Sequence, residues 1–293
     1  MYKAILYIIG FLFFIILLLI IASKVAYYQF QKTTDKKVRQ LFDIDTISQT
    51  PLVSESDLVK LPENVRRWLV YSQVVGRPYI QSVRAKQTVS MRLSKGKAWI
   101  PATVKQYIAT KNQEFIWNAT IQAAPLFHIS GRDTCIDGHG NMIIKLFSLL
   151  TIANAKGAEI DQGSFIRYLA EIVWYPTYAL DESISWKSID KNTAKATMKC
   201  GNNGDNAVSG IFYFDESGYV TKFTADRYGD FNGEYRIEKW TATMGPYREF
   251  NGILIPSSGQ ITWNLEDGDF TWYHFEIVNI EYNTPHLYPN SNP

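Results

Sequence analysis

An uncharged, apolar run at the N-terminus constrains this chain more than any other feature of its sequence. Residues 4–23 contain no charged side chain and are flanked by Lys3 and Lys24. At a rise of about 1.5 Å per residue, a helix over this run would be roughly 30 Å long, the thickness of a bilayer's hydrocarbon core. A cleaved signal peptide is the alternative, but its apolar region is usually only about 7–15 residues long and ends at a small-x-small site. We therefore predict a single-pass anchor over residues 1–24, held in a lipid bilayer through residues 4–23.

The charged residues that follow this run bear on which side of the membrane the large domain lies. The positive-inside rule places the large domain on the cytoplasmic side, because basic residues are more numerous after the run than before it. The same residues would also suit anionic headgroups at either leaflet, so sidedness stays open. Residues 25–42 have a helix-compatible composition, and we predict a stalk and linker over residues 25–54. The basic residues concerned are Lys24, Lys32, Lys36, Lys37 and Arg39.

The composition of the remaining chain favours a folded β-rich domain. Hydrophobic residues make up 46% of the 293 residues and aromatic residues 14%, which supplies a core and suits a pleated sheet. The net charge of +2 shows no basic excess of the kind that nucleic-acid binding requires. We expect no nucleic-acid partner.

The hydrophobic period changes from helical to strand-like after residue 78. Val83, Ala85, Gln87, Val89 and Met91 alternate with polar residues, as in a half-buried strand. Roughly a dozen such segments follow, joined by turn sequences, which implies antiparallel pairing. They are expected at residues 83–92, 99–110, 115–122, 127–136, 142–147, 184–189, 193–200, 208–214, 219–227, 234–243, 247–250, 253–263 and 272–282.

Two helical segments accompany these strands, at residues 62–75 and 161–175. In the first, Pro62 suits the opening turn and Gly76 the C-terminal cap. In the second, Arg167 and Glu171 are four residues apart and can pair on one helix face. Two helices are too few to cover both faces of a parallel sheet. We predict a mainly β (α+β) domain over residues 55–283, with a large curled antiparallel sheet, half-barrel-like, whose helices pack in or near its concave face, and a loose tail over residues 284–293.

Three segments carry a resemblance to a known family: Leu61–Leu69 with Val75–Pro78, Arg167–Glu171 with Trp174–Thr177, and Tyr247–Phe250 with Gly252 and Ile255–Pro256. Together they resemble a bacterial family of membrane-anchored proteins of unknown function, over about residues 55–282. The resemblance assigns no catalytic residues. The layout is also similar to that of the periplasmic lipoprotein-carrier fold, which implies a half-barrel with helices in its mouth and acyl chains on its concave face.

Catalytic and metal-binding patterns are sparse. His128, Cys135 and His139 lie close in sequence, but residues 128 and 135 differ in strand parity and a fourth zinc ligand is missing, so we expect no metal site and no cofactor. Cys135 and Cys200 have no paired metal spacing, which favours two buried free thiols; a disulfide is the alternative in an oxidising compartment. No nucleophile elbow, zinc-protease motif or P-loop is present.

The helix at 161–175 holds the strongest candidate site, because Arg167, Glu171, Trp174 and Tyr175 combine charge with aromatic area. If this helix lies in the mouth of the sheet, Arg167 would meet an anionic headgroup and Trp174 an acyl chain. The alternative is a surface ion pair beside a core tryptophan. The function favoured is a membrane-anchored, non-enzymatic binding module for a lipid or another hydrophobic ligand. Two alternatives remain: an envelope scaffold that binds a protein, and an enzyme with Glu171 or His274 as its base.

Overall fold

The computed structural model describes residues 2–42, 50–124, 127–201 and 206–289. Its helices are α1 (Tyr2–Phe42), α2 (Glu55–Leu58), α3 (Glu63–Tyr71) and α4 (Ala158–Glu171), with 3₁₀ turns η1 (Ile172–Trp174) and η2 (Pro176–Leu180). Its strands are β1 (Ser82–Met91), β2 (Ile100–Ala109), β3 (Glu114–Ala124), β4 (Phe127–Ile136), β5 (His139–Leu146), β6 (Leu150–Ala155), β7 (Ile184–Asp190), β8 (Thr193–Cys200), β9 (Asn206–Phe214), β10 (Val220–Phe231), β11 (Glu234–Met244), β12 (Tyr247–Phe250), β13 (Ile253–Pro256), β14 (Ser258–Leu265) and β15 (Gly268–Tyr282).

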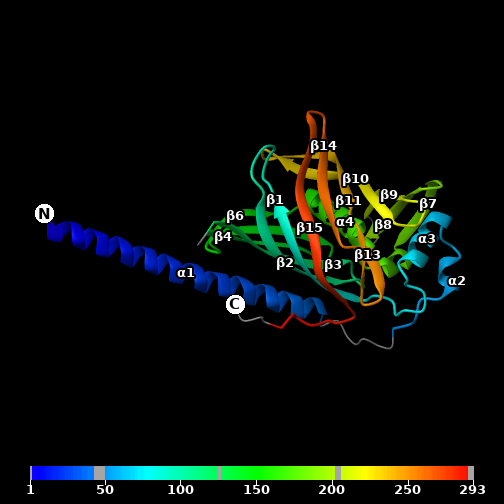
Figure 1. The fold of residues 1–293 in the computed structure, drawn as a ribbon, viewed down its shortest axis with the longest axis horizontal. Helices are drawn as coiled ribbons and strands as arrows, with labels where there is room; N and C mark the ends of the chain where they lie inside the picture. Colours follow the sequence, from blue (N-terminus) through cyan, green and yellow to red (C-terminus); the bar gives the residue numbers. More distant parts are fainter. Residues whose placement is uncertain (1, 43–49, 125–126, 202–205, 290–293) are drawn as a thin grey trace.

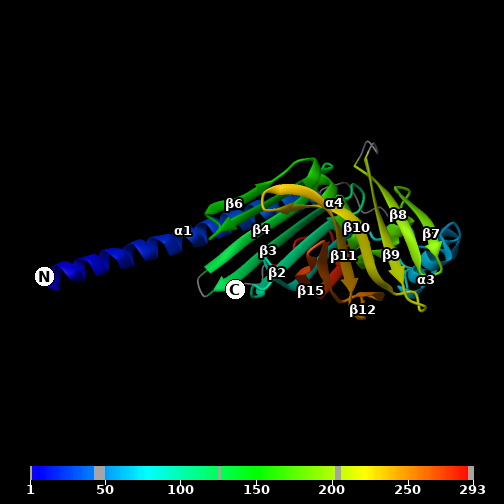
Figure 2. The ribbon, with the colours of Figure 1, turned by 90° about the horizontal axis from the view of Figure 1, so that it is seen from above.

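One antiparallel sheet dominates the fold. It has 13 strands in the order β6-β5-β4-β3-β2-β1-β15-β14-β11-β10-β9-β8-β7, and β12 and β13 form a separate two-stranded hairpin. A twisted sheet of this size curls, and Figures 1 and 2 show the strands curving around α4 as an open half-barrel. The predicted mainly β half-barrel with helices in its concave face is therefore confirmed.

Strand register separates the two faces of this sheet. Asp133 of β4 lies opposite Trp117 of β3 and Met142 of β5, and these side chains share the concave face with α4. Arg132, the next residue along β4, points to the outer face, where its Nη1 donates to Thr34 Oγ1 of α1 at 3.0 Å. A single core of buried apolar and aromatic side chains fills most of the concave face.

α1 is continuous from the apolar run into the domain. Among the described residues it is the one helix long and apolar enough to cross a membrane. Its C-terminal half packs on the outer face of β2, β3 and β4 with one side of the helix. The side chains that make this contact recur every three or four residues, as a helix face requires: Ser23, Tyr27, Phe30, Thr34, Val38 and Leu41.

The C-terminal segment lies on the same outer face. Tyr288 is buried against Tyr107, and its hydroxyl donates to the carbonyl of Arg84 at 2.9 Å. The tail is thus held to the sheet as far as Tyr288.

Several element boundaries differ from expectation. α3 ends at Tyr71, and Gln73 (φ 61°) takes the left-handed position, so the predicted cap at Gly76 is wrong; Gly76 (φ 78°) belongs to the next turn. α4 begins at Ala158 and gives way to a 3₁₀ turn at Ile172. β6 was not foreseen, and the single strand expected at 253–263 is divided into β13 and β14.

Candidate functional site

α4 is clamped between two strands of the concave face. Near its N-terminus, Asp161 Oδ1 accepts a hydrogen bond from the backbone N–H of Gly140 in β5 at 2.6 Å. On the other side, Gln162 Nε2 donates to the carbonyl of Asp226 in β10 at 2.9 Å. These contacts hold α4 inside the half-barrel, between β5 and β10 (Figure 1).

Arg167 is held by two carboxylates. Its Nε donates to Glu171 Oε1 at 2.7 Å, which is the predicted pairing along the helix. Its Nη1 donates to Asp133 Oδ2 of β4, also at 2.7 Å. The guanidinium carbon lies 4.9 Å from the ring centre of Phe115, which adds a cation–π contact. Charge-assisted bonds of this length fix the side chain in one orientation.

Two glutamine side chains extend this pair across β2 to β1, in the middle of the sheet. Gln87 Nε2 of β1 donates to Gln106 Oε1 of β2 at 2.9 Å, and Gln106 Nε2 donates to Glu171 Oε2 at 2.6 Å. Both oxygens of Glu171 are therefore engaged.

Burial and charge act against each other at these groups. Burial raises the pKa of Asp133 and the pKa of Glu171, and the nearby Arg167 guanidinium opposes both shifts. Burial also disfavours the charged form of Arg167, but the two carboxylates outweigh it and raise the pKa of this side chain. Arg167 stays protonated, because removing its proton would leave two carboxylates unpaired in a low dielectric.

A second arginine completes the group. Arg227 of β10 donates from Nε to the carbonyl of Gly163 in α4 at 3.0 Å and lies over Trp240 and Trp263, at 5.4 and 5.6 Å from their ring centres. A Cβ at Gly163 would lie 3.2 Å from Arg227 Nη2, so the bare backbone permits this approach. Among the described residues Arg227 has no salt bridge, and burial lowers its pKa to about 10, which leaves it charged at neutral pH.

We call Asp133, Arg167, Glu171 and Arg227 the charged cluster. Its two cations and two anions come from β4, α4 and β10, which are far apart in sequence. The helix spacing predicted the Arg167–Glu171 pair, but the sequence did not identify Asp133, Gln106 and Arg227 as site residues. The alternation of inward and outward positions could have indicated Asp133 and Gln106. Both are polar side chains at inward positions of strands whose other inward residues are mostly apolar.

The structure places the other two predicted site residues elsewhere. Trp174 is buried against Phe275, with ring centres 5.2 Å apart. Tyr175 is fully buried and its hydroxyl donates to the carbonyl of Tyr168 at 3.0 Å. Arg167 and Glu171 thus share one site, whereas Trp174 and Tyr175 pack in the core beyond it.

An apolar wall extends from the charged cluster toward the end of the domain from which α1 emerges. Its residues lie on the concave face by register, and each is only partly buried. We call this set the proximal wall: Ile129 of β4 with Met142, Ile144 and Leu146 of β5. In Figures 1 and 2 these strands lie at the end of the domain from which the apolar part of α1 extends.

The remaining sequence candidates are dispersed. His274 lies opposite Ser90, on the outer face, and stacks on Trp99 with ring centres 4.2 Å apart, so it cannot act together with Glu171 on the concave face. Cys135 and Cys200 are buried free thiols. His128 bonds Ser148 and lies on the face opposite Cys135, as its parity predicts.

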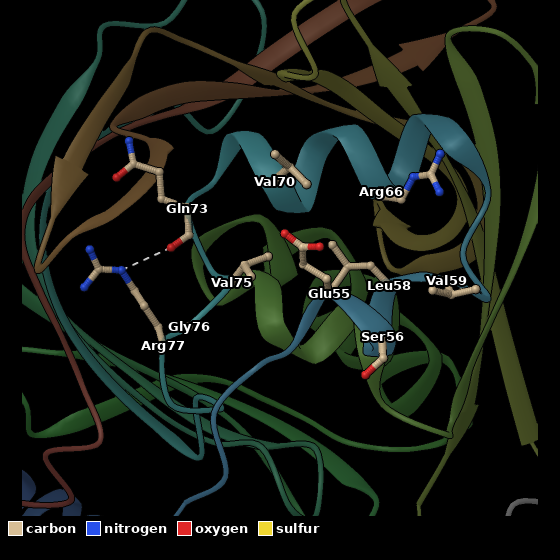
Figure 3. Close-up of a pocket in the computed structure, with 10 residues that line it drawn as sticks. All are labelled: Glu55, Ser56, Leu58, Val59, Arg66, Val70, Gln73, Val75, Gly76 and Arg77. Carbon is tan, nitrogen blue, oxygen red and sulfur yellow. Dashed lines mark hydrogen bonds between the residues drawn. The ribbon is translucent and has the colours of Figure 1, made fainter.

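A separate pocket of 770 Å³ lies at the opposite end of the domain, between α2 and α3 (Figure 3). Arg77 lies at one side of it, and its Nε donates to the carbonyl of Gln73 at 3.1 Å. The pocket is lined by Glu55, Ser56, Leu58, Val59, Arg66, Val70, Gln73, Val75, Gly76 and Arg77.

Parts of the three segments that carry the family resemblance contact one another beside this pocket. Arg77 covers Gly252 of the β12–β13 hairpin, and Leu254 N donates to the carbonyl of Ser72 at 3.2 Å. Thr177 Oγ1 accepts from the backbone N–H of Ile80 at 2.9 Å. These contacts join the first segment to the third, and the end of the second segment to the chain just after the first.

Comparison with known proteins agrees with this resemblance. The model of a family of unknown function (DUF6544) matches residues 51–275, and the chain belongs to that family. No curated protein matches. Among solved structures, a DUF1329 family protein from Desulfovibrio piger is similar at 9% identity, with a TM-score of 0.41 over 75% of this chain and 92% of that one. A LolA superfamily protein from Nitrosomonas europaea is similar at 8% identity, with a TM-score of 0.32 over 77% of this chain and 94% of that one. At these values the likeness concerns the arrangement of strands alone.

Proposed function

We propose that this member of the family is a membrane-anchored binding module for an amphipathic, lipid-like ligand, and that it performs no catalytic step. The ligand lies on the concave face, with its apolar part on the proximal wall and an anionic group at the charged cluster. One observation carries this proposal: partly exposed apolar side chains lead directly to half-buried arginines, on the end of the sheet nearest the apolar part of α1.

The dimensions suit such a ligand. From Phe127 to Asp133, β4 extends roughly 20 Å at ordinary strand geometry. Along α1, the rise from Ser23 to Thr34, which bonds Arg132 beside the charged cluster, is roughly 16 Å. The two estimates place the cluster well above the end of the apolar run, at a height that an extended acyl chain can span.

The charges favour an anionic group on that ligand. Arg227 is a half-buried cation with a carbonyl as its hydrogen-bond partner, and its charge is only partly offset by Asp133 and Glu171. The indole N–H of Trp240 beside it has no hydrogen-bond partner among the described residues. A phosphate or carboxylate would supply acceptors to both, and charge-assisted bonds of this kind are among the stronger ones.

The anchor supplies access to the ligand. With residues 4–23 in the bilayer, the packed half of α1 holds the proximal wall at the membrane surface. Either side of the membrane would serve, and the basic residues after the run favour the cytoplasmic side.

Photo-crosslinking in nanodiscs tests this function. The full chain is reconstituted with phosphatidylglycerol that carries a diazirine near the end of one acyl chain, and adducts are mapped by mass spectrometry. We expect adducts on Met142, Ile144 and Leu146, besides those on residues 4–23. Arg227→Gln should reduce the wall adducts several-fold and leave those on α1 unchanged, which makes α1 an internal control. Adducts confined to α1 in the unmodified chain would exclude the proposal.

A further inference from the structure

We propose that five apolar residues at the end of the proximal wall enter the interface of the same bilayer that α1 crosses. We call them the rim: Phe127, Phe147, Leu149, Leu150 and Ile152. The inference rests on the proposed membrane anchoring and adds a second, peripheral membrane contact made by the β-domain itself.

The rim lies at the level where the apolar run of α1 ends. Ser23, the last residue of that run, donates from its hydroxyl to the carbonyl of Phe147 at 3.0 Å. The next helix residue, Lys24, is exposed and charged. A helix that is buried in hydrocarbon up to Ser23 therefore brings the β5–β6 turn to the headgroup region, where chains cross from apolar to polar surroundings.

The composition of the rim suits that position. Leu149, Leu150 and Ile152 are 46%, 62% and 54% exposed, and residues 146–155 include no charged side chain. A contiguous group of exposed apolar residues usually marks an interaction surface. β6 is also an edge strand of the large sheet, and soluble proteins protect such edges with charges or prolines that β6 lacks.

The other edge of the sheet is built differently. β7 ends in the turn Asp190-Lys191-Asn192, and Lys187, Ser188 and Asp190 are exposed along it. β7 lies at the end of the domain opposite to the apolar part of α1 (Figures 1 and 2). The apolar edge thus faces the anchor and the polar edge faces away, which is the asymmetry that a membrane surface on one side predicts.

The turn is fixed to the helix, so its depth follows from the helix. Ser148 is buried and hydrogen-bonds Ser130 and His128, at 2.8 and 3.1 Å. The ring of His128 meets that of Tyr27 of α1 edge-on, with centres 5.5 Å apart. The ring of Phe127 packs on Phe147 with centres 4.9 Å apart. These contacts attach the turn that begins the rim directly to α1.

The membrane is the occupant that these contacts select, rather than a protein. The surface continues directly from the transmembrane segment, and a bilayer requires only apolar area without directional partners. Docking of the rim would open the proximal wall to the lipid phase, so that a ligand reaches the charged cluster without crossing water.

Spin-label depth measurements test the inference. Nitroxides are attached to Leu150→Cys and, as the matched control, to Ile189→Cys, which is 55% exposed on β7. The native thiols are buried and should not react. In nanodiscs of phosphatidylcholine and phosphatidylglycerol, the label at 150 should be relaxed more by oxygen than by a water-soluble nickel complex, and the label at 189 should show the reverse. Equal exposure of both labels to the nickel complex would overturn the inference, as would protection at 150 that appears only when other membrane proteins are added.

Two controls separate this inference from the proposed function. Arg227→Gln should leave the depth of the 150 label unchanged while it reduces the wall adducts several-fold. In the unmodified chain, an immersed rim without wall adducts would refute only the ligand proposal. Wall adducts with a water-exposed rim would refute only the rim. Flotation with vesicles checks the shared premise: a chain that stays in the buffer fraction would refute both.

Discussion

The two ends of the half-barrel use the same sheet in opposite ways. At the distal end, around α3, η1 and η2, the concave face is filled: Trp68 is fully buried and stacks on Phe212 with ring centres 6.0 Å apart. At the proximal end, near the apolar part of α1, the inward side chains of β4 and β5 remain partly exposed. The charged cluster lies between these two regions.

This difference separates stability from binding within one sheet. The distal end supplies the well-packed, interlocking contacts from which most folding free energy derives. The proximal end keeps apolar area uncovered, which lowers stability unless another apolar phase covers it. Substitutions should therefore act mainly on folding at the distal end and mainly on ligand or membrane contact at the proximal end.

The largest expected effect is at the distal core. Trp68→Ala should lower the free energy of unfolding by about 3–5 kcal/mol, because it removes a buried indole and leaves a cavity. Ile144→Ala on the proximal wall should cost about 1 kcal/mol, because that side chain is only partly buried. Urea unfolding in mild detergent, followed by circular dichroism, measures both. If the alanine variant does not fold, Trp68→Phe replaces it in the comparison. Equal losses of unfolding free energy at residues 68 and 144 would contradict the distinction between the two ends.

The charged cluster at the boundary should show a pH-dependent effect. Arg167→Gln leaves Asp133 and Glu171 without their cation and should destabilise the fold by about 3–5 kcal/mol near pH 7. Burial already raises the pKa of both carboxyls, and loss of the arginine raises it further. A raised carboxyl pKa favours the fold below the unfolded-state pKa and loses that contribution as pH rises through the folded-state value.

The destabilisation by Arg167→Gln should therefore shrink as the pH is lowered from 7, because the two carboxyls then take up protons and no longer need a cation. Urea titrations at a series of pH values give this profile. A cost that stays constant or grows on acidification would show that these carboxyls are not coupled to Arg167.

Two glycines give a matched pair of smaller effects. Gly252 (φ 78°) joins β12 to β13 at the distal end, and a Cβ there would collide with the guanidinium of Arg77. Gly233 (φ 87°) is in the β10–β11 turn and has open space around it. In both alanine variants the left-handed backbone should lower the free energy of unfolding by about 1–2 kcal/mol. Gly252→Ala should lower it by about 1 kcal/mol more, because the added Cβ also disturbs the packing. Thermal melting compares them; the same melting temperature in both would show that Arg77 moves aside freely.

The smallest effect is expected on the outer face of the sheet, behind the charged cluster. Thr34→Val removes the oxygen that accepts from Arg132 Nη1, beneath a buried stretch of α1. We expect a loss of about 1–2 kcal/mol, which is the cost of leaving a buried donor without a partner. Thr33→Val, on the exposed side of the same helix, is the control. Proteases should cleave within residues 25–42 faster in Thr34→Val than in Thr33→Val. Equal protease resistance would mean that the helix is held by its apolar contacts alone.

Local patterns predicted most of the fold. Alternation identified most of the strands, and Asp137-Gly138 and Asn251-Gly252 were correctly assigned to hairpin turns, because both signals reside within a few adjacent residues. β6 was missed because its sequence, Leu-Thr-Ile-Ala-Asn-Ala, is short and weakly alternating. The division at Ser257 was missed because a change of sheet leaves no gap in the hydrophobic pattern.

The candidate site was less accessible from sequence. The Arg167–Glu171 pair follows from helix geometry. Arg227, 60 residues after Arg167, reaches this pair only because the sheet curls and brings β10 against α4. Trp174 and Tyr175 were assigned to the site on the assumption that α4 continues, whereas the 3₁₀ turn at Ile172 redirects them into the core. Contacts that depend on the curl of a whole sheet have no local signature.

A crystal structure of the full chain grown from a lipidic phase tests the central claim most directly. We predict elongated density on the concave face, running from the rim along Met142 and Ile144 and ending at the guanidinium groups of Arg167 and Arg227. Side chains of α4 or of the β10–β11 hairpin closed against Met142 and Ile144, with no density between them, would contradict the account.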